Sequence, residues 1–106
     1  MENKELLDKI KKINNYINNS HKWIPETEKL LLKTMKLTEE VWELYSEILI
    51  NLNFTRKWKV WNNENLKMEL ADVIITTLVI AADFWIDMEE QIWKKLDIIY
   101  ERFNLN

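Results

Sequence analysis

Apolar residues recur along this chain at the three- and four-residue spacing of an α-helix, in four segments separated by connectors without that spacing. The helices predicted from this spacing cover residues 3–18, 25–51, 63–85 and 87–103. Pro25 suits the first turn of the second helix, and Asp87, followed three residues later by Glu90, resembles a capping box at the start of the fourth. No alternating strand pattern competes. The sequence therefore predicts an all-α fold in which residues 1–106 form a single helical domain.

Apolar side chains on the second predicted helix form two stripes instead of the usual one. The first stripe contains Leu30, Leu37, Val41, Leu44, Ile48 and Leu52, and the second contains Leu31, Met35, Trp42 and Leu49. A small bundle covers one stripe from within the chain more easily than two, and six tryptophans among 47% hydrophobic residues add further apolar surface. We therefore expect a bundle of four helices completed by oligomerisation, as a homodimer or a dimer of dimers.

The third predicted helix places a carboxylate in an apolar setting. Residues 70–82 read LADVIITTLVIAA, and Asp72 is the one ionisable side chain in that run. An unpaired carboxylate there would lose several kcal/mol through desolvation, so Asp72 should be paired, protonated or bound to a metal. Glu69 lies three residues earlier and shares the same face of the helix.

The second helix carries a matching acidic strip, in which Glu40 and Glu43 share a face with Lys36 and Glu39 lies at the edge. If the two helices pack about 8–10 Å apart, their acids converge. Carboxylates about 5 Å apart repel by roughly 3 kcal/mol at an effective dielectric constant of 20, and a divalent cation turns that repulsion into attraction. Oxygen ligands on rigid helices suit Mg²⁺ or Mn²⁺, which often also bind substrate phosphates. The alternative for either acidic pair alone is a solvated helix face.

Composition excludes several other kinds of site. The chain has no glycine, which P-loops and dinucleotide-binding turns require, and no cysteine for disulfides, thiolate metal sites or nucleophiles. Its net charge of −3 gives no general attraction to nucleic acid or anionic membranes, and no apolar run reaches the roughly 20 residues of a membrane span. The charged N-terminal segment lacks the apolar core of a signal peptide. We expect a cytoplasmic protein that binds neither nucleic acid nor membranes.

The two acidic segments, EEVWE at residues 39–43 and ELAD at residues 69–72, resemble the paired EExxE and ExxD motifs of the MazG-like all-α nucleoside triphosphate pyrophosphohydrolases. That superfamily includes the all-α dCTP and dUTP pyrophosphatases. The likeness continues through the IDMEE turn and the final basic helix, so it covers about residues 23–103. By this resemblance the chain is a MazG-like helical bundle.

The resemblance implies a hydrolase that uses Mg²⁺, or Mn²⁺ in its place, to convert a nucleoside or deoxynucleoside triphosphate into the monophosphate and pyrophosphate. A pyrimidine or modified dNTP, removed in nucleotide-pool house-cleaning, is the substrate class that it favours. It assigns the metal to Glu40, Glu43, Glu69 and Asp72, and gives Glu39 a catalytic role as an outer ligand or in orienting the attacking water. It assigns the substrate phosphates to Lys36, Lys95 and Arg102, and the stacked base to Trp23. The alternative role for Lys95 and Arg102 is to complement the dipole at the C-terminal end of their helix. The alternative for Trp23 is packing in the core.

The chain departs from the family pattern at two positions. Many relatives have Gly where Trp42 stands, and many have a substrate-binding Asn where Ile99 stands, so the pocket and its substrate would differ. The connector between the second and third helices carries Phe54, Trp58 and Trp61, which fit hydrophobic cover or a subunit interface equally well. Two other functions stay open: a catalytically silent helical interaction protein that uses its Trp-rich surfaces, and an enzyme similar to phosphoribosyl-ATP pyrophosphohydrolase.

Overall fold

The computed structural model describes residues 3–52 and 63–105, and all secondary structure in these segments is helical. The helices are α1 (Asn3–Ser20), α2 (Glu26–Asn51), α3 (Asn63–Asp83) and α4 (Met88–Arg102). The all-α prediction is confirmed, and each observed boundary lies within two residues of the predicted one. The aromatic connector with Phe54, Trp58 and Trp61 lies outside the described residues. Of the helices in the described segments, none is both long and apolar enough to cross a lipid bilayer.

Residues other than glycine end the last two helices. Trp85 follows α3 with a φ of 56°, and Asn104 follows α4 with a φ of 55°. At each end the next amide reaches back to close the helix: Ile86 N donates to Ala81 O at 3.1 Å, and Leu105 N donates to Tyr100 O at 2.8 Å. This is the Schellman arrangement, which usually places glycine in the left-handed position. A chain without glycine must use asparagine, or accept the steric cost of a residue such as tryptophan.

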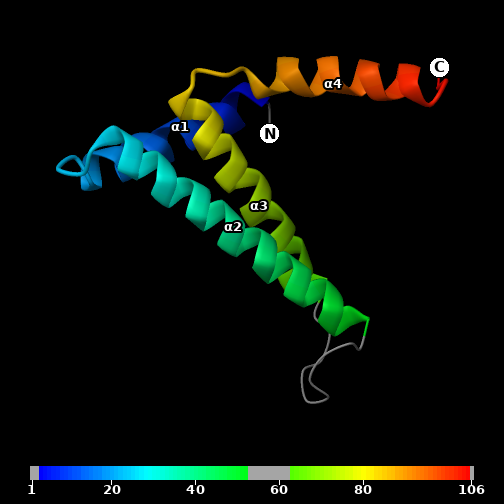
Figure 1. The fold of residues 1–106 in the computed structure, drawn as a ribbon, viewed down its shortest axis with the longest axis horizontal. Helices are drawn as coiled ribbons and strands as arrows, with labels where there is room; N and C mark the ends of the chain where they lie inside the picture. The colour runs from blue at the N-terminus through cyan, green and yellow to red at the C-terminus, as the bar shows by residue number, and fades with distance from the viewer. Residues whose placement is uncertain (1–2, 53–62, 106) are drawn as a thin grey trace.

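Helices α2 and α3 lie side by side and run in opposite directions, while α1 crosses the C-terminal half of α3 (Figure 1). Their meeting points bury Ile10 of α1, Ile50 of α2, and Val79 and Ala81 of α3. This packing leaves the first stripe of α2 partly covered. In the second stripe Leu49 is half-buried, but the other three side chains stay in solvent, with exposed fractions of 58% for Leu31 and 66% for Met35 and Trp42.

Helix α4 extends away from the other three (Figure 1). It begins where the Asp87 carboxylate accepts a hydrogen bond from the Glu90 amide at 3.2 Å, which confirms the predicted N-cap. Its contact with the rest of the described chain is peripheral and includes a hydrogen bond from Asn3 Nδ2 to Glu89 Oε1 at 3.1 Å. Three helices thus pack together within one chain. A complete four-helix bundle, and the oligomer that would form it, stay predictions.

A buried polar network joins α1, α2 and α3. Lys33 Nζ contacts Asn14 Oδ1 at 2.8 Å, Asn18 Oδ1 at 2.7 Å and Asp83 Oδ2 at 2.5 Å. The Asn14 and Asn18 amides in turn donate to Asp83 Oδ1. Burial alone would raise the pKa of Asp83, but these hydrogen bonds and the Lys33 charge together lower it. The three helices are therefore held in register by a charged group whose hydrogen bonds are satisfied.

Candidate metal centre

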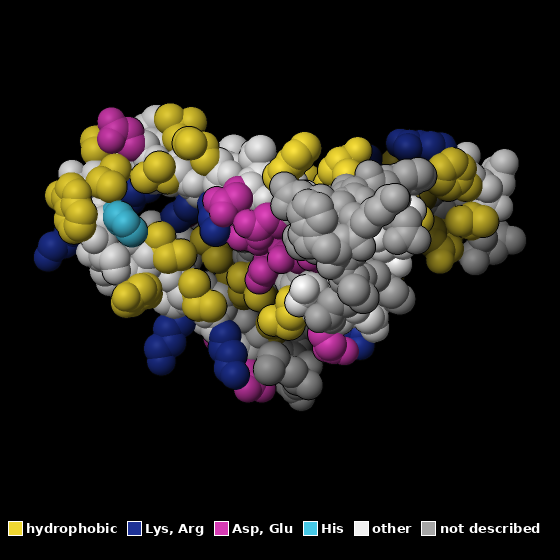
Figure 2. Space-filling view, turned by 90° about the horizontal axis from the view of Figure 1, so that it is seen from below, with side chains coloured by type: hydrophobic (Ala, Val, Ile, Leu, Met, Phe, Trp, Pro, Cys, Tyr) yellow, Lys and Arg dark blue, Asp and Glu magenta, His cyan; other side chains and the backbone are white. Residues whose placement is uncertain are grey.

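Acidic side chains from α2 and α3 converge between the two helices. Glu40, Glu43 and Glu69 each place a carboxylate oxygen within 4.8 Å of the others, and we call these three residues the acidic cluster. The helical spacing of Glu40 and Glu43 turns both toward α3, where Glu69 meets them. Figure 2 shows acidic side chains gathered on one face of the molecule, with hydrophobic side chains exposed around them. The cluster lies where the two sequence motifs predicted that the helices would meet.

Two oxygens of the acidic cluster are buried without a hydrogen-bond partner. Glu40 is only 6% exposed, and its Oε2 makes no hydrogen bond within the described residues. Glu69 Oε2 is buried and unpartnered in the same way. In the described segments, these are the buried side-chain polar atoms left without a partner, and both belong to the cluster. A buried carboxylate oxygen without a partner loses its hydration and gains nothing in return, so a proton, a water or a cation bound there would stabilise it.

The electrostatics of the acidic cluster favour an added positive charge. Burial raises the pKa of Glu69, and the neighbouring charges of Glu43, Asp72 and Glu40 raise it further. Each of these effects disfavours the ionised carboxylate. A proton or a cation therefore stabilises the cluster, and a cation can neutralise more than one carboxylate at a time.

Lys36 supplies part of that positive charge at the rim of the cluster. Its Nζ lies 3.1 Å from Glu40 Oε1 and 3.4 Å from Glu39 Oε1. The hydrogen bond to Glu40, together with the charges of Glu39 and Glu40, raises the pKa of Lys36, so it stays an ammonium. Because the exposed Lys36 pairs with Oε1 of Glu40, it leaves Glu40 Oε2 free for another ligand.

Two of the predicted acidic residues lie beside the cluster and not within it. Asp72 is half-buried and close enough to raise the pKa of Glu69 by its charge, but it does not belong to the set of three oxygens within 4.8 Å. Glu39 is exposed and paired with Lys36, at the edge where the helical spacing placed it. Their roles as fourth ligand and as outer ligand stay predictions.

The remaining predicted site residues lie apart from the acids within this chain. Lys95 and Arg102 are exposed on α4, which extends away from the α2–α3 pair (Figure 1). Trp23 stands between α1 and α2, is 74% exposed, and has its ring 5.9 Å from that of His21. Its exposure argues against the alternative that it packs in the core of this chain. Trp42 is also exposed and stacks on Tyr45 at 5.6 Å between ring centroids.

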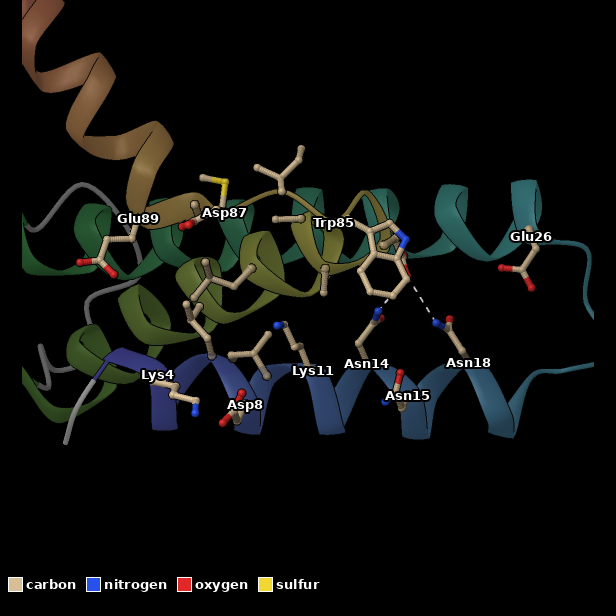
Figure 3. Close-up of a pocket in the computed structure, with 18 residues that line it drawn as sticks. Lys4, Asp8, Lys11, Asn14, Asn15, Asn18, Glu26, Trp85, Asp87 and Glu89 are labelled. Atoms are coloured by element: carbon tan, nitrogen blue, oxygen red, sulfur yellow. Dashed lines mark hydrogen bonds between the residues drawn. The ribbon is translucent and has the colours of Figure 1, made fainter.

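A separate hollow of about 670 Å³ lies between α1 and the segment that joins α3 to α4. Figure 3 shows Asn14 and Asn18 of α1 across from Trp85, with their hydrogen bonds to Asp83 drawn as dashed lines. None of the acidic-cluster residues lines it. Sequence reasoning missed both this hollow and the Lys33 network beside it. The available signal was a lysine on an apolar helix, seven residues before Glu40, with two asparagines four apart on the preceding helix.

A comparison with protein-family models, curated proteins and solved structures gives no match for this chain. Function must therefore be inferred from the side chains themselves. The acidic cluster is the place in the described chain where unsatisfied buried polar atoms and several charges of one sign coincide.

Proposed function

We propose that this protein is a Mg²⁺-dependent nucleoside triphosphate pyrophosphohydrolase whose metal centre is the acidic cluster. The observation that carries the proposal is the pair of buried, unpartnered oxygens, Glu40 Oε2 and Glu69 Oε2, within a group of three converging carboxylates. A solvated acidic helix face would leave such oxygens in water, where hydration satisfies them. Their burial supports a bound cation over that alternative.

The donor set fits a hard divalent cation. All three side chains offer carboxylate oxygens, and the residues stand on the interior turns of two packed helices. Mg²⁺ and Mn²⁺ prefer such ligands and keep several coordinated waters, which leaves room for substrate phosphates. Asp72 is the candidate for a fourth protein ligand, because its charge already acts on Glu69. A cation bound there supplies two things: a water with a lowered pKa and positive charge against the triphosphate.

The chain's own residues then divide the work of hydrolysis. Glu40, Glu43 and Glu69 hold the site, Glu39 at its edge accepts a hydrogen bond from the attacking water, and Lys36 at the rim pairs with a phosphate oxygen. The water oxygen forms a bond to the α-phosphorus while the bond from that phosphorus to the bridging oxygen breaks. Pyrophosphate leaves with the bridging oxygen, the nucleoside monophosphate keeps the oxygen from water, and the protons of that water pass to the phosphate products and the solvent. No covalent bond to the protein is needed, which suits a chain without cysteine.

The substrate that we propose is a pyrimidine or modified dNTP. The exposed indole of Trp23 is available for stacking, and the ring of His21 beside it could form the same platform. An enzyme acting on phosphoribosyl-ATP would keep the reaction and change the substrate. The acidic cluster fits both, so the choice depends on a substrate panel.

A helical interaction protein without catalysis is the second candidate function. The observation in its favour is the exposed stripe of Leu31, Met35 and Trp42 on α2. That stripe and the acidic cluster occupy different faces of α2, so an interaction surface does not exclude a metal centre. The two unpartnered oxygens are explained by a cation and are not explained by protein binding through the stripe.

The deciding experiment is pyrophosphate release from canonical and modified dNTPs with Mg²⁺ or Mn²⁺. The test variant is Glu43→Gln, and Glu47→Gln is the matched control, because Glu47 is a half-buried glutamate one turn further along α2. We expect turnover in the wild type and in Glu47→Gln, and none in Glu43→Gln. Turnover that survives in Glu43→Gln would place the reaction elsewhere. If the folded wild type releases no pyrophosphate from any dNTP of the panel, the result would favour the interaction protein.

A further inference from the structure

Within the described residues, the apolar face of α4 is largely uncovered. Helical geometry gathers seven side chains into one arc of roughly 140°, which we call the α4 arc. Its members are Met88, Ile92, Trp93, Leu96, Ile99, Tyr100 and Phe103. Five of them, from Leu96 at 36% to Phe103 at 63%, are exposed. An amphipathic helix with this much bare apolar surface is stable when another surface covers the arc.

The amount of exposed surface suits a second copy of the chain as that cover. The chain has an accessible surface of 8866 Å². A compact monomer of its mass exposes about 6,300 Å², which is about 2,500 Å² less. An obligate dimer buries at least about 1,000 Å² from each chain, so the surplus is large enough for such an interface.

A surface of matching length lies on α2. Leu31, Met35, Trp42 and Tyr45 form a stripe, here called the α2 stripe, with exposed fractions from 50% to 66%. From its first to its last residue the α2 stripe rises about 21 Å, and the 15 residues of α4 rise about 22 Å. The two surfaces are therefore of nearly equal length, and both stay exposed among the described residues of the chain.

Charges along their edges select one way of docking. Lys95 and Arg102 border one edge of the α4 arc, whereas Asp97 and Glu101 lie along the other. The α2 stripe is bordered on one side by Glu39, which is ion-paired with Lys36 and lies at the edge of the acidic cluster. Attraction favours the basic edge of α4 against the acidic edge of α2, and the reversed arrangement sets carboxylates against carboxylates.

We propose that α4 of one copy lies on the α2 stripe of a second copy, and that the second copy returns the same contact. Such a reciprocal interface closes on itself as a symmetric dimer. The docking does not depend on any catalytic activity. It would also bring Lys95 and Arg102 of the second copy to the side of α2 that carries Glu39, beside the acidic cluster that neither residue approaches in its own chain.

Sedimentation tests the dimer without any nucleotide. We expect the wild type to sediment at twice the chain mass of 13.0 kDa. Leu96→Asp should raise the dimer dissociation constant at least about thirtyfold, because it puts a charge at the centre of the α4 arc. Ile98→Asp is the matched control, since Ile98 lies on the opposite side of α4 and is 50% exposed, against 36% for Leu96. A monomeric wild type, or equal effects of the two variants with helicity retained, would overturn the proposal.

Cross-linking tests which surface α4 covers. The chain has no cysteine, so each introduced thiol is unique. Leu96→Cys and Met35→Cys chains are refolded together and oxidised, and we expect a disulfide between the two different chains. Ile98→Cys refolded with Met35→Cys is the control that should not cross-link. If Leu96→Cys chains instead cross-link mainly to one another, or fail to cross-link with Met35→Cys, the α2 stripe is not the partner surface.

Discussion

Lys33 on α2 and Asp83 at the end of α3 form an ion pair in which the lysine side chain is only 7% exposed. The pair is 50 residues apart in sequence, and its atoms also contact Asn14 and Asn18 of α1. Charges removed from water are stable only when their remaining hydrogen bonds are made, and here they are. The pair thus ties together the three helices that position the acidic cluster.

Removal of the lysine should destabilise the fold. Lys33→Met leaves the Asp83 carboxylate without its counter-ion, and we expect a loss of about 3–5 kcal/mol in the free energy of unfolding. Urea denaturation followed by circular dichroism measures the loss. The double variant Lys33→Met with Asp83→Asn should recover part of it, because no unpaired charge then remains. An exposed lysine provides the control: Lys9→Met should change the free energy by less than about 1 kcal/mol.

Acid should weaken the fold through the same pair. Hydrogen bonds from Lys33, Asn14 and Asn18 outweigh burial and hold the pKa of Asp83 below its ordinary value of 3.8. Because the unfolded state binds the proton more tightly, the stabilisation is present above pH 3.8 and is lost as the pH falls through the lower native pKa. The difference in unfolding free energy between wild type and Asp83→Asn should therefore stay constant near neutrality and shrink below pH 3.8. If the difference in unfolding free energy between the two proteins does not change with pH, groups other than Asp83 cause the acid sensitivity.

Helical periodicity and capping signals were sufficient to predict all four helices and their ends within two residues. The two acidic motifs were sufficient to predict that Glu40, Glu43 and Glu69 meet, because helices joined by a connector and carrying apolar faces pack against each other. The convergence of Asp72 was harder to predict. One residue position on a helix rotates a side chain by about 100°, so small changes in the rotation of α3 decide whether a fourth acid joins three others.

Periodicity could not show which helices pack within one chain. The α4 arc is as amphipathic as a bundle helix should be, and yet α4 extends away from its own chain (Figure 1). An apolar face indicates that a helix will be covered and does not identify the chain that covers it. The Lys33 network escaped prediction for a related reason. Its partners come from three helices, and a buried lysine has the same sequence signature as a solvated one.

Relief of strain at the end of α3 should stabilise the protein. Trp85 has a φ of 56° and is 92% exposed, so its conformation costs energy and its indole packs little against the described residues. Comparison of Trp85→Gly with Trp85→Ala isolates the backbone, since both variants remove the indole. Glycine avoids the steric cost of the left-handed conformation, but its unfolded chain has more conformational entropy, which offsets part of that gain. We expect the free energy of unfolding of the glycine variant to exceed that of the alanine variant by roughly 0.5–1 kcal/mol. Equal stabilities in urea denaturation would mean that the turn relaxes when the indole is removed.

Magnesium should stabilise the folded protein in the absence of any nucleotide. A ligand at one hundred times its dissociation constant adds about 2.7 kcal/mol to the free energy of unfolding, provided that it binds the folded state alone. The midpoint temperature of thermal unfolding of the wild type should therefore rise as Mg²⁺ is added. Saturating Mn²⁺ should raise it to the same value. Glu40→Gln should lose most of this shift, because it replaces the oxygen that is buried without a partner. Glu47→Gln should keep it.

The Glu69→Gln variant separates a metal site from ionic-strength effects. Burial and the charges of Glu43, Asp72 and Glu40 raise the pKa of Glu69, so the ionised side chain destabilises the metal-free fold at neutral pH. A neutral amide at this position should make the metal-free protein more stable than the wild type, and it should also reduce the gain on adding Mg²⁺. Salt that merely screens the acidic residues would give the same shift with K⁺ at matched ionic strength. Equal shifts with Mg²⁺ and K⁺ in the wild type would exclude a specific metal centre in the acidic cluster.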